Sequence, residues 1–163
     1  MKFVVDRTAP VVTVVGLADG GRYQTESQIV TLVPTDDGGA LKSIAVTLLD
    51  RDGNVVSELM NLSGEDFAKA LEEDNGKLTF EVPEGLFQSV RIICDDEADY
   101  GSGENILYDE TITNVSVASS AFLIFWANEP LRWGSIGGTA AVAAGAAAFI
   151  VIGKRKKDEK ENK

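Results

Sequence analysis

The chain has 163 residues, enough for one ordinary domain and a short appendage, and a net charge of −11. This acidic balance repels phosphate backbones and excludes sequence-independent nucleic-acid binding, so we expect no nucleic-acid partner. The absence of histidine and the single cysteine, Cys94, exclude an intramolecular disulfide, Ser-His and Cys-His catalysis and a usual zinc site.

Short segments rich in β-forming residues follow one another through the first 117 residues. They span residues 11–15, 28–33, 42–49, 77–82, 88–94 and 109–117. Turn signals separate them, for example Asp19-Gly20-Gly21, Asp52-Gly53-Asn54 and Pro83-Glu84-Gly85. This spacing predicts an all-β fold, an antiparallel β-sandwich.

Alternation within two of these segments predicts the side chains that face the core. Ile44, Val46 and Leu48 share one face of their strand. In residues 88–94, Cys94 shares its face with Val90 and Ile92, so we interpret it as a small buried hydrophobic residue and not as a reactive thiol.

A helix signal interrupts the strands after Ser63. That serine is followed three residues later by Asp66, the pattern of an N-cap with an acidic partner, and Phe67 and Leu71 recur at helical spacing. The pattern predicts a short inserted helix over residues 64–73, lying across one end of the sandwich and stopped by Asn75-Gly76.

The opening VDRTAP of residues 5–10, followed by VVTVVGL, resembles the start of bacterial immunoglobulin-like (Ig-like) domains of cell-surface proteins. The stretch CDDEAD of residues 94–99 and the closing YDETITNVSV fit the end of such a domain. The resemblance covers residues 1–118 and implies an Ig-like β-sandwich. It also implies a repeated spacer-like or adhesive module beside neighbouring Ig-like domains, without implying a catalytic site.

Acidic clusters are the remaining candidates for binding chemistry, with calcium as the ion that carboxylate oxygens favour. Asp95, Asp96, Glu97 and Asp99, with Glu104 nearby, form the densest group, at the end of a predicted strand. A solvated acidic loop is the default interpretation, and an inter-domain calcium site is the alternative. Asp50-Arg51-Asp52-Gly53-Asn54 and Asp36-Asp37-Gly38-Gly39 are explained as turns, and no other cofactor is expected.

The segment AFLIFWA at residues 121–127 is either a final strand or an interfacial segment. We favour the second interpretation, a membrane-proximal stalk over residues 119–134 in which Phe122, Phe125 and Trp126 pack at the lipid boundary. Asn128-Glu129-Pro130 then breaks this segment.

An uncharged run from Trp133 to Gly153 is long enough to cross a bilayer as a helix. Lys154, Arg155, Lys156 and Lys157 follow it, and basic residues mark the cytoplasmic side. Residues 136–163 carry six basic and three acidic residues, a net +3, whereas residues 1–135 carry nine and 23, a net −14. We therefore predict a single-pass transmembrane helix over 135–153, a cytoplasmic tail over 154–163 and an extracellular N-terminal domain.

The first ten residues, MKFVVDRTAP, lack the apolar stretch of a secretory signal, which suggests the C-terminal end of a longer exported protein or a truncated reading frame. The leading hypothesis is a noncatalytic, membrane-anchored Ig-like module for display, spacing or adhesion, with membrane lipid and an extracellular protein or glycan as partners. The alternatives are the tether and accessory domain of a surface enzyme whose catalytic region lies upstream, and a calcium- or glycan-binding module.

Overall fold

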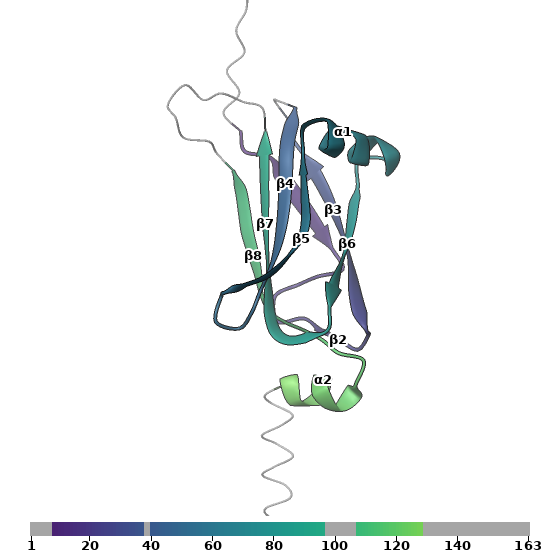
Figure 1. The fold of residues 1–163 in the computed structure, drawn as a ribbon, viewed down its shortest axis with the longest axis vertical. Coiled ribbons are helices and arrows are strands. Elements are labelled where there is room, and N and C mark those ends of the chain that lie inside the picture. The colour runs from purple at the N-terminus through teal and green to yellow at the C-terminus, as the bar shows by residue number, and fades with distance from the viewer. Residues whose placement is uncertain (1–7, 38–39, 97–106, 129–163) are drawn as a thin grey trace, which may run out of the picture. The chain divides into compact units, whose positions relative to one another are not determined.

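The computed structural model describes residues 8–37, 40–96 and 107–128 (Figure 1). In chain order the elements are β1 (Val11–Val15), β2 (Arg22–Tyr23), β3 (Ser27–Thr35), β4 (Leu41–Leu49), β5 (Val55–Ser63), α1 (Gly64–Glu73), β6 (Leu78–Pro83), β7 (Gly85–Asp96), β8 (Tyr108–Val117) and α2 (Ala121–Ala127). The chain forms two compact units, Met1–Ile124 and Phe125–Lys163, and every strand belongs to the first.

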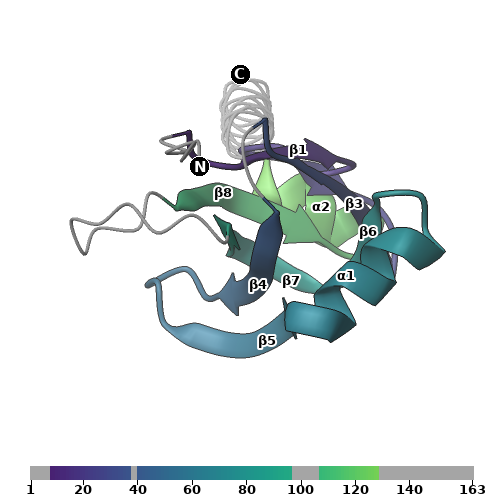
Figure 2. The same ribbon diagram turned by 90° about the horizontal axis from the view of Figure 1, so that it is seen from above.

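Two sheets make up the first unit, one with the strand order β1-β3-β6 and the other with the order β2-β8-β7-β4-β5. Neighbouring strands are antiparallel except for the short β2, which runs parallel to β8. Figure 2, seen along the strands, shows the sheets as two layers with α1 at the side between β5 and β6. The protein is thus mostly β, with two packed sheets, as the sequence predicted.

The buried faces of the two sheets meet in one hydrophobic core. Ile44, Val46 and Leu48 of β4 are buried, as their alternation predicted. They lie opposite Cys94, Ile92 and Val90 of β7 in the register, so each predicted core face packs beside the other in the same sheet.

Two strands were not predicted from the sequence, β5 and the two-residue β2. In β5, an edge strand of the larger sheet, no residue is fully buried, and Leu59, Met60 and Leu62 pack against the core only in part. Its sequence, VVSELMNLS, accordingly lacks the alternation of apolar and polar residues that marks a half-buried strand. The other six strands were predicted within a few residues of their bounds.

Helix α1 has the predicted bounds and packs against β4 and β5 at the end of the sandwich where β4 begins (Figure 1). Phe67 is its buried anchor, with no exposed surface. The Gly76 N–H donates to the Leu71 carbonyl at 2.6 Å, and Asn75 and Gly76 have φ of 51° and 79°, which ends the helix as predicted.

The predicted serine cap of α1 does not form: the Ser63 side chain makes no capping hydrogen bond. Ser63 is still paired with Ser43 in the sheet. Gly64, at φ 55°, follows directly, and this positive φ, which glycine adopts without strain, turns the chain from β5 into α1.

The segment 121–127 forms a short helix, α2, and not a final strand. Phe122, Leu123 and Trp126 are exposed on it, with 63%, 41% and 37% of their surface accessible. Among the residues that the structure describes, no helix is long and apolar enough to cross a membrane. The predicted span 135–153, its flanking Trp133, Lys154, Arg155, Lys156 and Lys157, and the tail 154–163 lie outside those residues.

Candidate functional site

The end of the sandwich where β1 begins, here named the upper end, brings together three segments that are distant in sequence (Figure 1). They are residues 8–10 before β1, residues 36–37 after β3, and Asp95–Asp96 at the end of β7. The register explains the meeting, because Val11 lies opposite Thr35 and Leu41 lies opposite Asp96.

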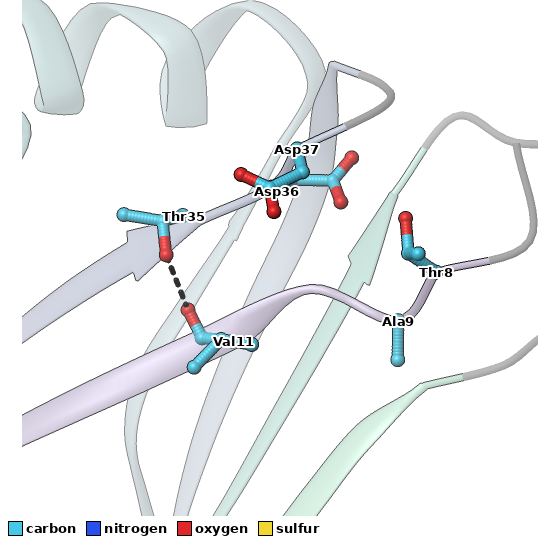
Figure 3. A pocket seen from close by; sticks show the side chains of 6 residues that line it. All are labelled: Thr8, Ala9, Val11, Thr35, Asp36 and Asp37. Carbon is cyan, nitrogen blue, oxygen red and sulfur yellow. Dashed lines mark hydrogen bonds between the residues drawn. The ribbon is translucent and has the colours of Figure 1, made fainter.

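A hollow of about 330 Å³ lies between two of these segments (Figure 3). Thr8, Ala9, Val11, Thr35, Asp36 and Asp37 line it. The Thr35 hydroxyl donates to the Val11 carbonyl at 3.4 Å and holds the two strands together beside it. With two carboxylates on its wall, the hollow suits a cation or a group that donates hydrogen bonds.

Two of the four residues predicted as calcium ligands, Asp95 and Asp96, are described, and they differ in surroundings. The Asp95 carboxylate forms an ion pair with Lys42 at 3.2 Å. Asp96 is buried, with 2% of its surface exposed. Because neighbouring residues of a strand point to opposite faces of a sheet, the two carboxylates do not converge on one point.

Glu97 and Asp99, with the nearby Glu104, lie outside the described residues. In the described part of the chain, no three acidic, cysteine or histidine side chains form a group able to hold a metal ion. Calcium binding at the upper end therefore remains a prediction.

Cys94 precedes this acidic pair and is fully buried in the core, as its alternation predicted. Burial, followed by the nearby carboxylates of Asp95, Asp96 and Asp36, raises the pKa of the thiol to about 12. The thiolate, which is the reactive form, is therefore almost absent at neutral pH.

The Asp50–Asn54 stretch is the turn between β4 and β5, as expected. The Asp50 carboxylate accepts hydrogen bonds from the backbone N–H groups of Asp52 and Asn54, both at 2.9 Å. Hydrogen bonds from the Asn54 side chain are the largest cause of a lowered pKa at Asp50, and these backbone hydrogen bonds lower it further. The Asp50 carboxylate thus stabilises the turn that contains it. Gly53 supplies the positive φ, 85°, that this turn requires.

The opposite end of the sandwich, here named the lower end, holds contacts that the sequence did not reveal. It comprises residues 18–21, the 50–54 turn, residues 83–85 and the end of β8. Arg22 fixes this region, because its guanidinium donates to the carbonyls of Gly20, Gly21 and Asn114 at 2.9, 3.0 and 2.5 Å.

Phe87 stands between these elements with a φ of 57°, a rare conformation for a bulky residue. Its N–H donates to the buried Ser116 hydroxyl at 3.0 Å. The guanidinium carbons of Arg22 and Arg51 lie 5.6 and 5.2 Å from its ring centroid, within cation–π range. The three residues are far apart in sequence, so no local pattern predicts the cluster.

Comparison with known proteins adds no identity: no family model matches the chain, and no curated protein is significantly similar to it.

Proposed function

We propose that the chain is a noncatalytic Ig-like module that a C-terminal anchor displays on the outer face of a bacterial cell membrane. The strand order supports the Ig-like class. β1, β3 and β6 correspond to strands A, B and E of that fold, β4, β7 and β8 correspond to C, F and G, and β5 takes the place of C′. Helix α1 stands where strand D would connect the two sheets.

One observation carries the proposed role as a spacer: the chain enters and leaves the sandwich at opposite ends. Thr8–Pro10 lead into β1 at the upper end, whereas β8 finishes at the lower end, where Val117 pairs with Gly85 and Tyr23. A domain with its connections at opposite ends adds its full strand length to the distance between its neighbours. This geometry suits a module that holds another segment away from a surface.

Membrane attachment is tested by extraction at alkaline pH, which releases peripheral proteins and leaves spanning ones in the bilayer. We expect the full chain to stay in the membrane pellet. A matched variant lacking residues 135–163 should appear in the supernatant with an unchanged circular dichroism spectrum. Recovery of the full chain in the supernatant would refute the anchor.

Orientation is tested with a thiol reagent that does not cross membranes, because the native cysteine is buried. Thr79 is exposed on β6, so Thr79→Cys provides a reactive site on the sandwich. We expect this variant to be labelled on intact cells and the parent chain to remain unlabelled. Labelling only after cell lysis would place the sandwich on the cytoplasmic side.

A calcium-binding module is the second candidate, and the hollow beside Asp36 and Asp37 at the upper end favours it. A ligand that binds only the folded state raises the melting temperature. Calcium at millimolar concentration should therefore raise it, and Asp36→Asn with Asp37→Asn, which removes both carboxylates of the hollow, should abolish the rise. An unchanged melting temperature in the parent chain would discard this candidate.

The remaining alternative, a tether for a surface enzyme, depends on sequence beyond the sandwich. It is tested by the apparent mass of the native protein in membrane fractions, detected with an antibody against the sandwich. A band far above 17.4 kDa would place further domains on the same chain.

A further inference from the structure

Strand β1 presents an open edge. Among the described strands it pairs only with β3, in a continuous five-residue register from Val11 opposite Thr35 to Val15 opposite Thr31. Val12 points into the core, while Val11 and Val15 point outward with 58% and 55% of their surface exposed. Ile29 of the neighbouring strand is 60% exposed, so the outer surface at this edge carries three exposed apolar side chains among threonines.

The other edge strands of the two sheets carry features that discourage pairing with another chain. β2 has only two residues. β5 carries Glu58 and is irregular against β4, with register shifts after Val46 and after Leu48. β6 carries Glu81 and ends in Pro83. Short length, charge, proline and bulges are the usual protections of a sheet edge, and β1 contains none of them.

Electrostatics favours this edge for contact between two copies of the chain. Each copy has a net charge of −11, so most approaches bring like charges together. From Thr8 to Ala18, however, the sequence contains no charged residue. Two copies that meet along β1 therefore bring together strands that carry no charge of their own, which limits the repulsion between them.

The sequence of β1 also fits a symmetric contact, because VVTVV reads the same in both directions. If two such strands pair antiparallel about a two-fold axis at Thr13, every side chain lies opposite its own kind. Val11 then faces Val15 of the second copy, and Thr13 faces Thr13. Closed two-fold contacts of this isologous type are the commonest form of self-association.

We propose that two copies of the chain associate through β1, forming a continuous sheet in the order β6-β3-β1-β1-β3-β6. The occupant of this edge is a second copy and not an unrelated extended peptide. The contact is small compared with the roughly 800 Å² per partner of a stable interface, so its affinity is low. Confinement of both copies to one surface, or a high concentration, populates it.

Position-specific disulfide formation in the purified full-length chain, kept in non-ionic detergent and oxidised with copper phenanthroline, tests the proposal. Thr13→Cys places two thiols across the two-fold axis, whereas Thr79→Cys on β6 is exposed but distant from it. Cys94 is buried and adds little background. We expect disulfide-linked dimer to form at least about tenfold faster for Thr13→Cys. Equal rates, or faster cross-linking of Thr79→Cys, would overturn the proposal, because the two thiols would then meet by random collision or through a surface other than β1.

The register is tested by mixing two single variants, Val11→Cys and Val15→Cys. In the symmetric pairing these positions face each other, so the mixture should cross-link faster than either variant alone. Faster cross-linking of Val11→Cys with itself would reject the register.

The edge contact is tested by adding a charge of the kind that protects other sheet edges. Val15→Lys should slow dimer formation by Thr13→Cys to the rate of Thr79→Cys. An unchanged rate would overturn the edge contact. In cells, cross-linking of Thr13→Cys to a protein of another mass, in place of itself, would also contradict self-pairing.

Discussion

The two ends of the sandwich use carboxylates differently. At the lower end each of three acidic residues accepts a hydrogen bond from a backbone N–H group, in strand β8, in the 50–54 turn or just after β8. The pairs are Asp19 with Thr113 at 2.6 Å, Asp50 with Asn54 at 2.9 Å and Glu84 with Ser119 at 2.5 Å. Here the acids complete the hydrogen bonding of the main chain and hold the turns closed.

At the upper end, Asp95 pairs with the side chain of Lys42, and Asp36 and Asp37 line a hollow between segments far apart in the sequence. Phe67 of α1 is the buried anchor at this end. Of its acidic residues, Asp36 and Asp37 face the hollow, whereas Asp96 is buried. The same residue type is therefore structural where a backbone N–H donor lies within hydrogen-bond distance. It becomes a candidate for binding where several segments leave a hollow.

The largest expected effect comes from breaking the packing at the upper end. Phe67→Ala removes a fully buried ring and leaves a cavity, so we expect the free energy of unfolding to fall by about 3–5 kcal/mol. Chemical denaturation followed by circular dichroism measures it. Lys69→Ala on the exposed side of α1 is the matched control, and it removes only a surface ion pair with Glu73. Equal losses in the two variants would mean that α1 does not anchor this end.

Removing a lower-end carboxylate should have a smaller effect. Asp19→Ala leaves the Thr113 N–H and hydroxyl without their acceptor, and we expect a loss of about 1–2 kcal/mol. The upper-end control is Asp37→Ala, which removes an exposed carboxylate of the hollow and should leave the unfolding free energy unchanged. A loss at Asp37 as large as that at Asp19 would erase the distinction between the two ends.

The sequence predicted most of the fold because its strands alternate, with one side chain in the core and the next in solvent. Ile44, Val46 and Leu48 show this pattern and were identified, whereas β5 has no fully buried residue and was not. The helix was also predictable, from Phe67 and the Asn75-Gly76 stop. Its serine cap was not predicted correctly, because Ser63 is still paired in β5 and its side chain makes no capping hydrogen bond.

The candidate site was predictable only in part. The acidic pair Asp95 and Asp96 was identified as a cluster, but alternation along a strand separates two adjacent carboxylates. The hollow depends on Thr8, far away in sequence, meeting Asp36 through the pairing of β1 with β3. Such contacts follow from sheet register, which local composition does not encode.

Acid should weaken the lower end before the core. The pKa values of Asp50 and Glu84 are lowered by hydrogen bonds from Asn54 and Ser119, respectively. A lowered folded-state pKa contributes stability that is present above the unfolded value and is lost as the pH falls through the folded value. We expect a level melting temperature from neutral pH down to about 5 and a decline below about 4. Asp50→Asn with Glu84→Gln should make that decline shallower. An equally steep decline in the double variant would assign the acid sensitivity to other groups.

The smallest expected effect is on Cys94, which reports whether the upper end opens. Its pKa of about 12 and complete burial leave almost no accessible thiolate, so iodoacetamide at pH 8 should modify the native chain negligibly. Thr79→Cys, on the exposed face of β6, should react at its new site under the same conditions, and denaturant should release Cys94 to react as well. Because Cys94 lies beside Asp95, Asp96 and Asp36, its rate of modification measures how often the strand ends beneath the hollow separate. Rapid native-state modification would mean that the upper end opens often, and the hollow would then be a transient gap and not a preformed binding site.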